Sequence, residues 1–115
     1  MEERKPVILL VEDDDELAQV YKARFEAEGL NTVWAANGEE ALAKAVSETP
    51  TLILLDIMMP RVSGFDVLDI LRNTPQTKNT KVIMMTALSS EKDLERAKSL
   101  GVDDYIIKSQ VAMAD

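Results

Sequence analysis

Five residues that could act together in phosphate chemistry each follow directly on a short apolar run. Glu12 and Asp13 follow the first run, Asp56 the third, Thr86 the fourth and Lys108 the fifth. In open α/β sheets, ligands bind beyond the carboxyl ends of the strands, so these side chains are expected to converge. Carboxylates crowded in a partly desolvated crevice repel one another unless a cation neutralises them. Mg²⁺ suits such a group, because it prefers oxygen ligands and is commonly held by one or two carboxylates.

A carboxylate held beside that cation can attack a phosphoryl group and form an aspartyl phosphate. Lys108 would pair with a phosphoryl oxygen as a point charge, and the Thr86 hydroxyl would donate to another oxygen. The chain has no cysteine and no histidine, which excludes thiol nucleophiles, structural zinc sites and histidine-based acid–base schemes. An ionised Asp56 is already a nucleophile and requires no general base.

The runs that precede these residues have the pattern of buried strands. Residues 7–11, 52–55 and 82–85 are wholly apolar, which is typical of strands covered on both faces. Two further strands are predicted at 31–35 and 105–107. Segments with helical spacing lie between the strands, and Gly29, Pro50 and Gly101 mark ends. The predicted helices contain Leu17, Val20, Tyr21, Arg24 and Phe25; Ala41, Leu42, Ala45 and Val46 after an Asn37 cap; Phe65, Leu68 and Leu71; and a segment capped by Ser90.

Alternating strands and helices with short connections predict a parallel sheet with helices on both faces, a doubly wound α/β fold. The 115 residues, 46% of them hydrophobic, predict a single domain. No apolar run is long enough to span a bilayer and the first residues lack signal-peptide order, so we expect a cytoplasmic protein with no membrane contact. The net charge of −8 argues against direct nucleic-acid binding.

The segments around these residues together resemble the receiver domain of two-component response regulators, the CheY-like family. They read VEDD at 11–14, LLDIMMP at 54–60 followed by Ser63-Gly64, MTA at 85–87 and GVDDYIIK at 101–108. The resemblance extends from Val7 to Lys108. It implies that residues 1–115 form one receiver domain of flavodoxin-like (βα)5 type. The implied sheet has five parallel strands in the order 2-1-3-4-5, with a last helix short or missing after about 109–115.

The resemblance also implies a role for each site residue. Asp56 would be the phosphoacceptor, with Thr86 and Lys108 as the hydroxyl and the lysine that contact the phosphoryl group. Mg²⁺ would bind Asp13 directly, Glu12 through water, Asp56, and the backbone carbonyl of Met58. Tyr105 would be the aromatic residue that swings inward when Thr86 moves. Such a domain is a switch that catalyses only its own phosphorylation and dephosphorylation.

The partners implied by the resemblance are a sensor histidine kinase or phosphotransfer protein and a downstream protein or output domain.

Two departures from the family pattern affect the end of the chain. Ser109 stands where the family usually has a proline with a cis peptide bond, and a cis bond before a non-proline costs about 3–4 kcal/mol. Without a full fifth helix, exposed apolar surface favours a homodimer, formed by exchange or rearrangement of the C-terminal segment.

Three other functions compete with this interpretation. A phosphorylation-independent, receiver-like interaction module would keep the fold and lose the switch. A phosphatase of the haloacid-dehalogenase type also uses a strand-end aspartate and Mg²⁺, but it needs a second acid at the position occupied here by Met58. A dinucleotide-binding domain needs a glycine-rich turn after the first strand, and residues 11–17 contain no glycine.

Overall fold

A computed structural model describes residues 6–86 and 91–107 of the chain. Its strands are parallel and form one sheet in the order β2-β1-β3-β4-β5, which confirms the predicted doubly wound fold. Every predicted strand is present, with bounds that differ by at most one residue at an end. The elements are β1 Val7–Val11, α1 Asp15–Ala27, β2 Asn31–Ala35, α2 Gly38–Glu48, β3 Leu52–Asp56, α3 Gly64–Arg72, β4 Lys81–Thr86, α4 Glu91–Ser99 and β5 Asp104–Ile107.

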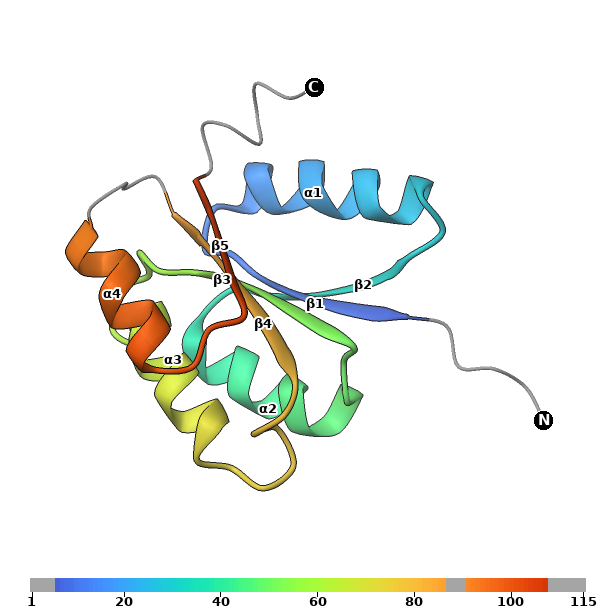
Figure 1. The fold of residues 1–115 in the computed structure, drawn as a ribbon. Coiled ribbons are helices and arrows are strands. Elements are labelled where there is room, and N and C mark those ends of the chain that lie inside the picture. The colour runs from blue at the N-terminus through green and yellow to red at the C-terminus, as the bar shows by residue number, and fades with distance from the viewer. Residues whose placement is uncertain (1–5, 87–90, 108–115) are drawn as a thin grey trace.

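Helix α1 covers one face of the sheet, and α2, α3 and α4 cover the other (Figure 1). The alternation of side chains along the strands separates the core into two layers. Leu9 and Val11 of β1 pack with α2 and α3 residues, whereas Ile8 and Leu10 pack with Ala18 and Tyr21 on the α1 side. Strand β1 is therefore buried on both faces, which explains its unbroken apolar sequence.

Short polar residues begin the first three helices. Asp14 caps α1 by accepting a hydrogen bond from the Leu17 N–H (3.1 Å), and Asp15 and Glu16 lie in the first turn. Asn37 accepts from the Glu40 N–H at 2.9 Å and opens α2 as predicted. Ser63 caps α3 in the same way. The predicted cap of α4, Ser90, lies outside the described residues.

Burial at three positions differs from what residue type alone suggests. Val20, one of the residues whose spacing predicted α1, is 56% exposed. Met58 is apolar but 58% exposed, whereas its neighbour Met59 is buried. The segment 74–80 is a surface loop in which Thr77 alone is buried. Its hydroxyl is satisfied there by donating to the Leu71 carbonyl at 2.7 Å. In each case the packing around the residue decides burial, and residue type does not.

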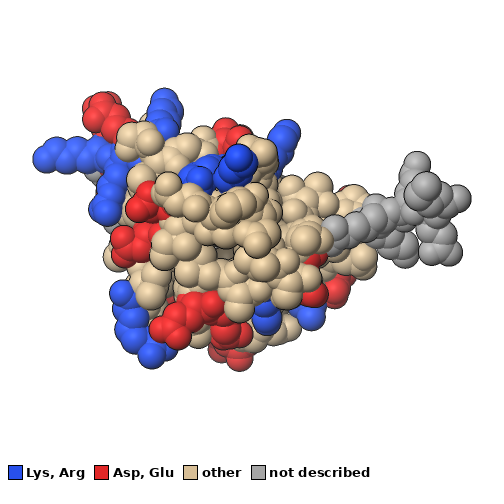
Figure 2. Space-filling model, turned by 90° about the horizontal axis from the view of Figure 1, so that it is seen from below, with Lys and Arg blue, Asp and Glu red and all other residues tan. Residues whose placement is uncertain are grey.

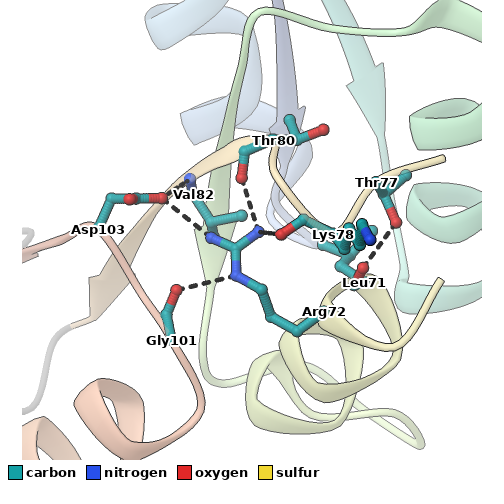
Figure 3. A network of polar contacts seen from close by, with 8 residues as sticks. All are labelled: Leu71, Arg72, Thr77, Lys78, Thr80, Val82, Gly101 and Asp103. Carbon is teal, nitrogen blue, oxygen red and sulfur yellow. Dashed lines mark hydrogen bonds and ion pairs between the residues drawn. The ribbon is translucent and has the colours of Figure 1, made fainter. Parts of the chain in front are cut away.

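Arg72, the last residue of α3, ties three segments together at the amino-terminal end of β4 (Figure 3). Its guanidinium donates to the carbonyls of Gly101 (2.9 Å) and Thr80 (2.7 Å). It also pairs with the Asp103 carboxylate at 2.9 Å, and that carboxylate accepts from the Val82 N–H. One side chain thereby fixes the turns that lead into β4 and β5.

Among the described residues, no helix is long and apolar enough to cross a membrane.

Candidate functional site

Three carboxylates meet at the carboxyl ends of the two central strands. Glu12 and Asp13 follow β1, and Asp56 is the last residue of β3. Val11 pairs with Leu55 in the sheet, so the residues that follow them emerge side by side. One carboxylate oxygen from each of Glu12, Asp13 and Asp56 lies within 4.8 Å of the others. The sequence prediction that these acids converge is confirmed by this grouping.

The three acids differ in exposure. Glu12 and Asp56 are buried, with 0% and 2% of their surfaces exposed, whereas Asp13 is open to solvent. The Asp14 N–H donates to Glu12 Oε2 and the Met58 N–H donates to Asp56 Oδ1, both at 3.2 Å. Carboxylates so close together favour a bound cation, and a set of hard oxygen donors suits a divalent ion such as Mg²⁺. The residues present therefore fit a metal of this kind.

Thr86 ends β4, on the far side of Asp56 from Glu12. Its neighbour Met85 pairs with Asp56 in the sheet, and Thr86 is fully buried. The Thr86 and Tyr105 side chains share a hydrogen bond. Burial raises the pKa of the Tyr105 hydroxyl above its ordinary value, the nearby negative charge of Asp93 raises it further, and the hydrogen bond with Thr86 lowers it. The two predicted switch residues are thus in direct contact.

The loop after β3 approaches Asp56 closely through Gly64. The Gly64 N–H donates to the Ile57 carbonyl at 2.9 Å. A Cβ atom on Gly64 would lie 2.4 Å from the Asp56 backbone oxygen and 2.7 Å from the Ile57 Cα. Only glycine allows this approach, so Gly64 supports the position of Asp56. Sequence reasoning noted Gly64 as part of a motif but gave it no role, because the approach is a tertiary contact.

Glu12 has a further contact that sequence reasoning missed. The indole N–H of Trp34 in β2 donates to the Glu12 backbone carbonyl at 2.8 Å. Trp34 is half-buried. Lys108 and the Lys108–Ser109 bond lie outside the described residues, as does the predicted short or missing last helix. Their predicted roles and geometry therefore remain predictions.

Comparison with known proteins agrees with this geometry. The sequence profile described as "Response regulator receiver domain" matches residues 8–113. The chain belongs to this family. Its curated relatives include the transcriptional regulatory protein CpxR of Escherichia coli, 46% identical over 101 residues, which are 88% of this chain and 42% of the relative. The phosphate regulon transcriptional regulatory protein PhoB of Rhizobium meliloti is 36% identical, over 90% of this chain and 45% of its own length.

Solved structures of similar domains share the fold of this receiver domain. The Vibrio cholerae chemotaxis protein CheY4 superposes with a TM-score of 0.87 at 28% identity, over 91% of this chain and 88% of that one. The receiver domain of Francisella response regulator 1452 gives 0.84 at 37% identity, over 91% and 85%. The chain spans less than half the length of the two curated relatives. The family match therefore establishes a two-component receiver domain and leaves the activity of any longer protein to proposal.

Proposed function

We propose that this receiver domain is a phosphoacceptor switch in which Asp56 takes a phosphoryl group in the presence of Mg²⁺. The observation that carries the proposal is the convergence of Glu12, Asp13 and Asp56 within 4.8 Å at the carboxyl ends of the central strands. Glu12, Asp13, Asp56 and the Met58 backbone carbonyl would hold the ion. When bound, Mg²⁺ would supply positive charge that offsets the charge of the carboxylates and of the phosphoryl oxygens.

The transfer itself needs few protein groups. A carboxylate oxygen of Asp56 forms a bond to phosphorus, while the bond between phosphorus and the donor atom breaks and its electron pair leaves with the donor. The Met58 N–H donates a hydrogen bond to the Oδ1 atom of the same carboxylate at 3.2 Å. The Thr86 hydroxyl would donate to one phosphoryl oxygen, and Lys108 would pair with another.

The switch would act through the contact between Thr86 and Tyr105. A new phosphoryl group on Asp56 competes for the Thr86 hydroxyl, which now shares a hydrogen bond with Tyr105. Movement of Thr86 would therefore change the position of the Tyr105 ring on β5. A charge added at one point then biases the equilibrium between two arrangements of a neighbouring element.

The donor we propose is a sensor histidine kinase or a phosphotransfer protein, and the recipient of the signal is a downstream protein or an output domain. The relatives named as transcriptional regulators are more than twice as long as the matched segment, which leaves room for such a domain in them. Direct nucleic-acid binding by this domain is not expected at a net charge of −8. On the face seen in Figure 2, basic side chains are interspersed with acidic ones around a largely uncharged centre.

The test is intact-mass measurement after incubation with acetyl phosphate and Mg²⁺. We expect one phosphoryl group per chain, absent without Mg²⁺ and absent from an Asp56→Asn variant. An Asp15→Asn variant is the matched control, because Asp15 is an exposed aspartate in the first turn of α1. Absence of the adduct from the folded wild type would refute the proposal and favour a phosphorylation-independent interaction module. Continued turnover of phosphate esters would instead indicate a phosphatase.

A further inference from the structure

The backbone carbonyl of Glu12 lies beyond the last residue pair of the β1–β2 ladder. That ladder ends with Val11 paired to Ala35, and the Glu12 N–H still donates to the Ala35 carbonyl at 3.1 Å. The Glu12 carbonyl accepts instead from the indole N–H of Trp34 at 2.8 Å. A side chain thus takes the place that a main-chain donor would occupy one step further along a longer strand.

Both the ring and the backbone of Trp34 are held in place. Its ring packs against the core layer beneath α1, which includes Leu10 and Tyr21. Because β2 is an edge strand, alternate backbone carbonyls point away from the sheet. The Trp34 carbonyl is one of these, and it accepts a hydrogen bond from the ammonium of Lys44 in α2 at 2.6 Å. The indole is therefore a fixed donor, fastened to the sheet edge and to the core.

Glu12 is fastened at three points as a result. Its N–H is bound by Ala35, its carbonyl by Trp34, and its Oε2 atom by the Asp14 N–H. The Ala35 contact continues the ladder, and the Asp14 contact lies within the same turn. Trp34 ties the turn that carries Glu12 and Asp13 to a side chain of another strand. Loss of this bond would remove one of the three contacts that hold Glu12 and would leave all three carboxylates in the chain.

We propose that Trp34 is a positioning residue for the cation site, which it serves by holding the turn that carries Glu12 and Asp13. This inference rests on the proposed function. Groups that hold metal ligands in place affect the metal strongly, and removing one commonly lowers affinity by about 10- to 100-fold. Trp34 acts through the backbone of a ligand-bearing turn, so we expect an effect near the lower end, about 10-fold.

The experiment compares Mg²⁺ dissociation constants by isothermal titration calorimetry in wild type and Trp34→Phe. Phenylalanine keeps an aromatic ring in the core and removes the N–H. The control is Phe25→Leu, which changes a partly buried ring of the same core layer that stacks on Tyr21. We expect Trp34→Phe to bind Mg²⁺ about 10-fold more weakly, and Phe25→Leu to lose stability while keeping the affinity of the wild type.

A second variant covers the case in which Trp34→Phe does not fold. Trp34 is the only tryptophan of the chain, so biosynthetic replacement of tryptophan by benzothienylalanine changes this one side chain. That ring has nearly the same shape and lacks the N–H donor. If either folded variant binds Mg²⁺ as tightly as the wild type does, the inference is overturned. The proposed function would still stand in that case, provided that the Asp56 adduct forms in the wild type. Failure of the wild type to bind Mg²⁺ would overturn the inference and the proposed function together.

Discussion

Replacement of Gly64 by alanine should damage both the fold and the phosphoacceptor. The new Cβ would lie 2.7 Å from the Ile57 Cα and 2.4 Å from the Asp56 backbone oxygen. Non-bonded carbon atoms prefer a separation of about 3.5–4.0 Å, so the loop and β3 must move apart by about 1 Å. Overpacking of this kind typically costs about 1–3 kcal/mol, and better helix propensity at the start of α3 returns only part of that.

The displacement reaches the chemistry because the clash is with Asp56 itself. A misplacement of about 1 Å at a reacting group can lower a rate by about 100-fold. We therefore expect Gly64→Ala to take up phosphate from acetyl phosphate about 100-fold more slowly. Urea unfolding measures the loss of stability, and intact mass as a function of time measures the rate.

Gly29→Ala provides the control. A Cβ at Gly29 meets no atom within 4 Å, but φ there is +84°, so alanine is strained. The expected loss is about 1–2 kcal/mol. Gly29 lies in the turn between α1 and β2, away from the acidic cluster, so phosphorylation should keep its normal rate. If Gly64→Ala were as stable and as readily phosphorylated as the wild type, the close approach would be unimportant for Asp56.

Three further changes test other parts of the structure. Arg72→Met removes the donor of the Gly101 and Thr80 carbonyls, leaves the Asp103 carboxylate with the Val82 N–H, and should lower the free energy of unfolding by about 2 kcal/mol; an unchanged urea midpoint would contradict this. Asn37→Ala removes the cap that binds the Glu40 N–H and should cost about 1 kcal/mol by the same assay, whereas equal stability would show the cap to be redundant. Because the pKa of Tyr105 is raised in the fold, the folded state holds this proton more tightly than the unfolded chain does. Stability should therefore fall as pH rises through 10.0 and the higher folded value, and should fall less in Tyr105→Phe; equal declines in both proteins would assign the loss to other groups.

The sequence was most informative where local pattern decides structure. Wholly apolar runs predicted β1, β3 and β4, because a strand covered on both faces has to be apolar throughout. The Asn37 cap was predictable because its partner is three residues away. The convergence of Glu12, Asp13 and Asp56 followed from a rule of topology, since the carboxyl ends of parallel strands share one edge.

Features that depend on distant contacts could not be predicted. Arg72 and Asp103 are 31 residues apart, and nothing local distinguishes that pair from surface charges. The indole of Trp34 reaches Glu12 across 22 residues, from a strand where tryptophan has many reasons to pack. The exposure of Met58 is equally unpredictable, because an apolar residue so near a strand end is usually buried, and β3 has already ended at Asp56.

The acidic cluster at one edge of the sheet lowers the stability of the fold, although the proposed function requires it. Three like charges held within 4.8 Å repel one another in the folded chain and are released on unfolding. Neutral residues at Glu12, Asp13 or Asp56 would ease that repulsion, and natural chains accept such strain where function requires it. Selection for thermostable variants in a chelator would therefore favour replacing these acids, so a library selected in this way should be phosphorylated poorly even as its melting temperature rises.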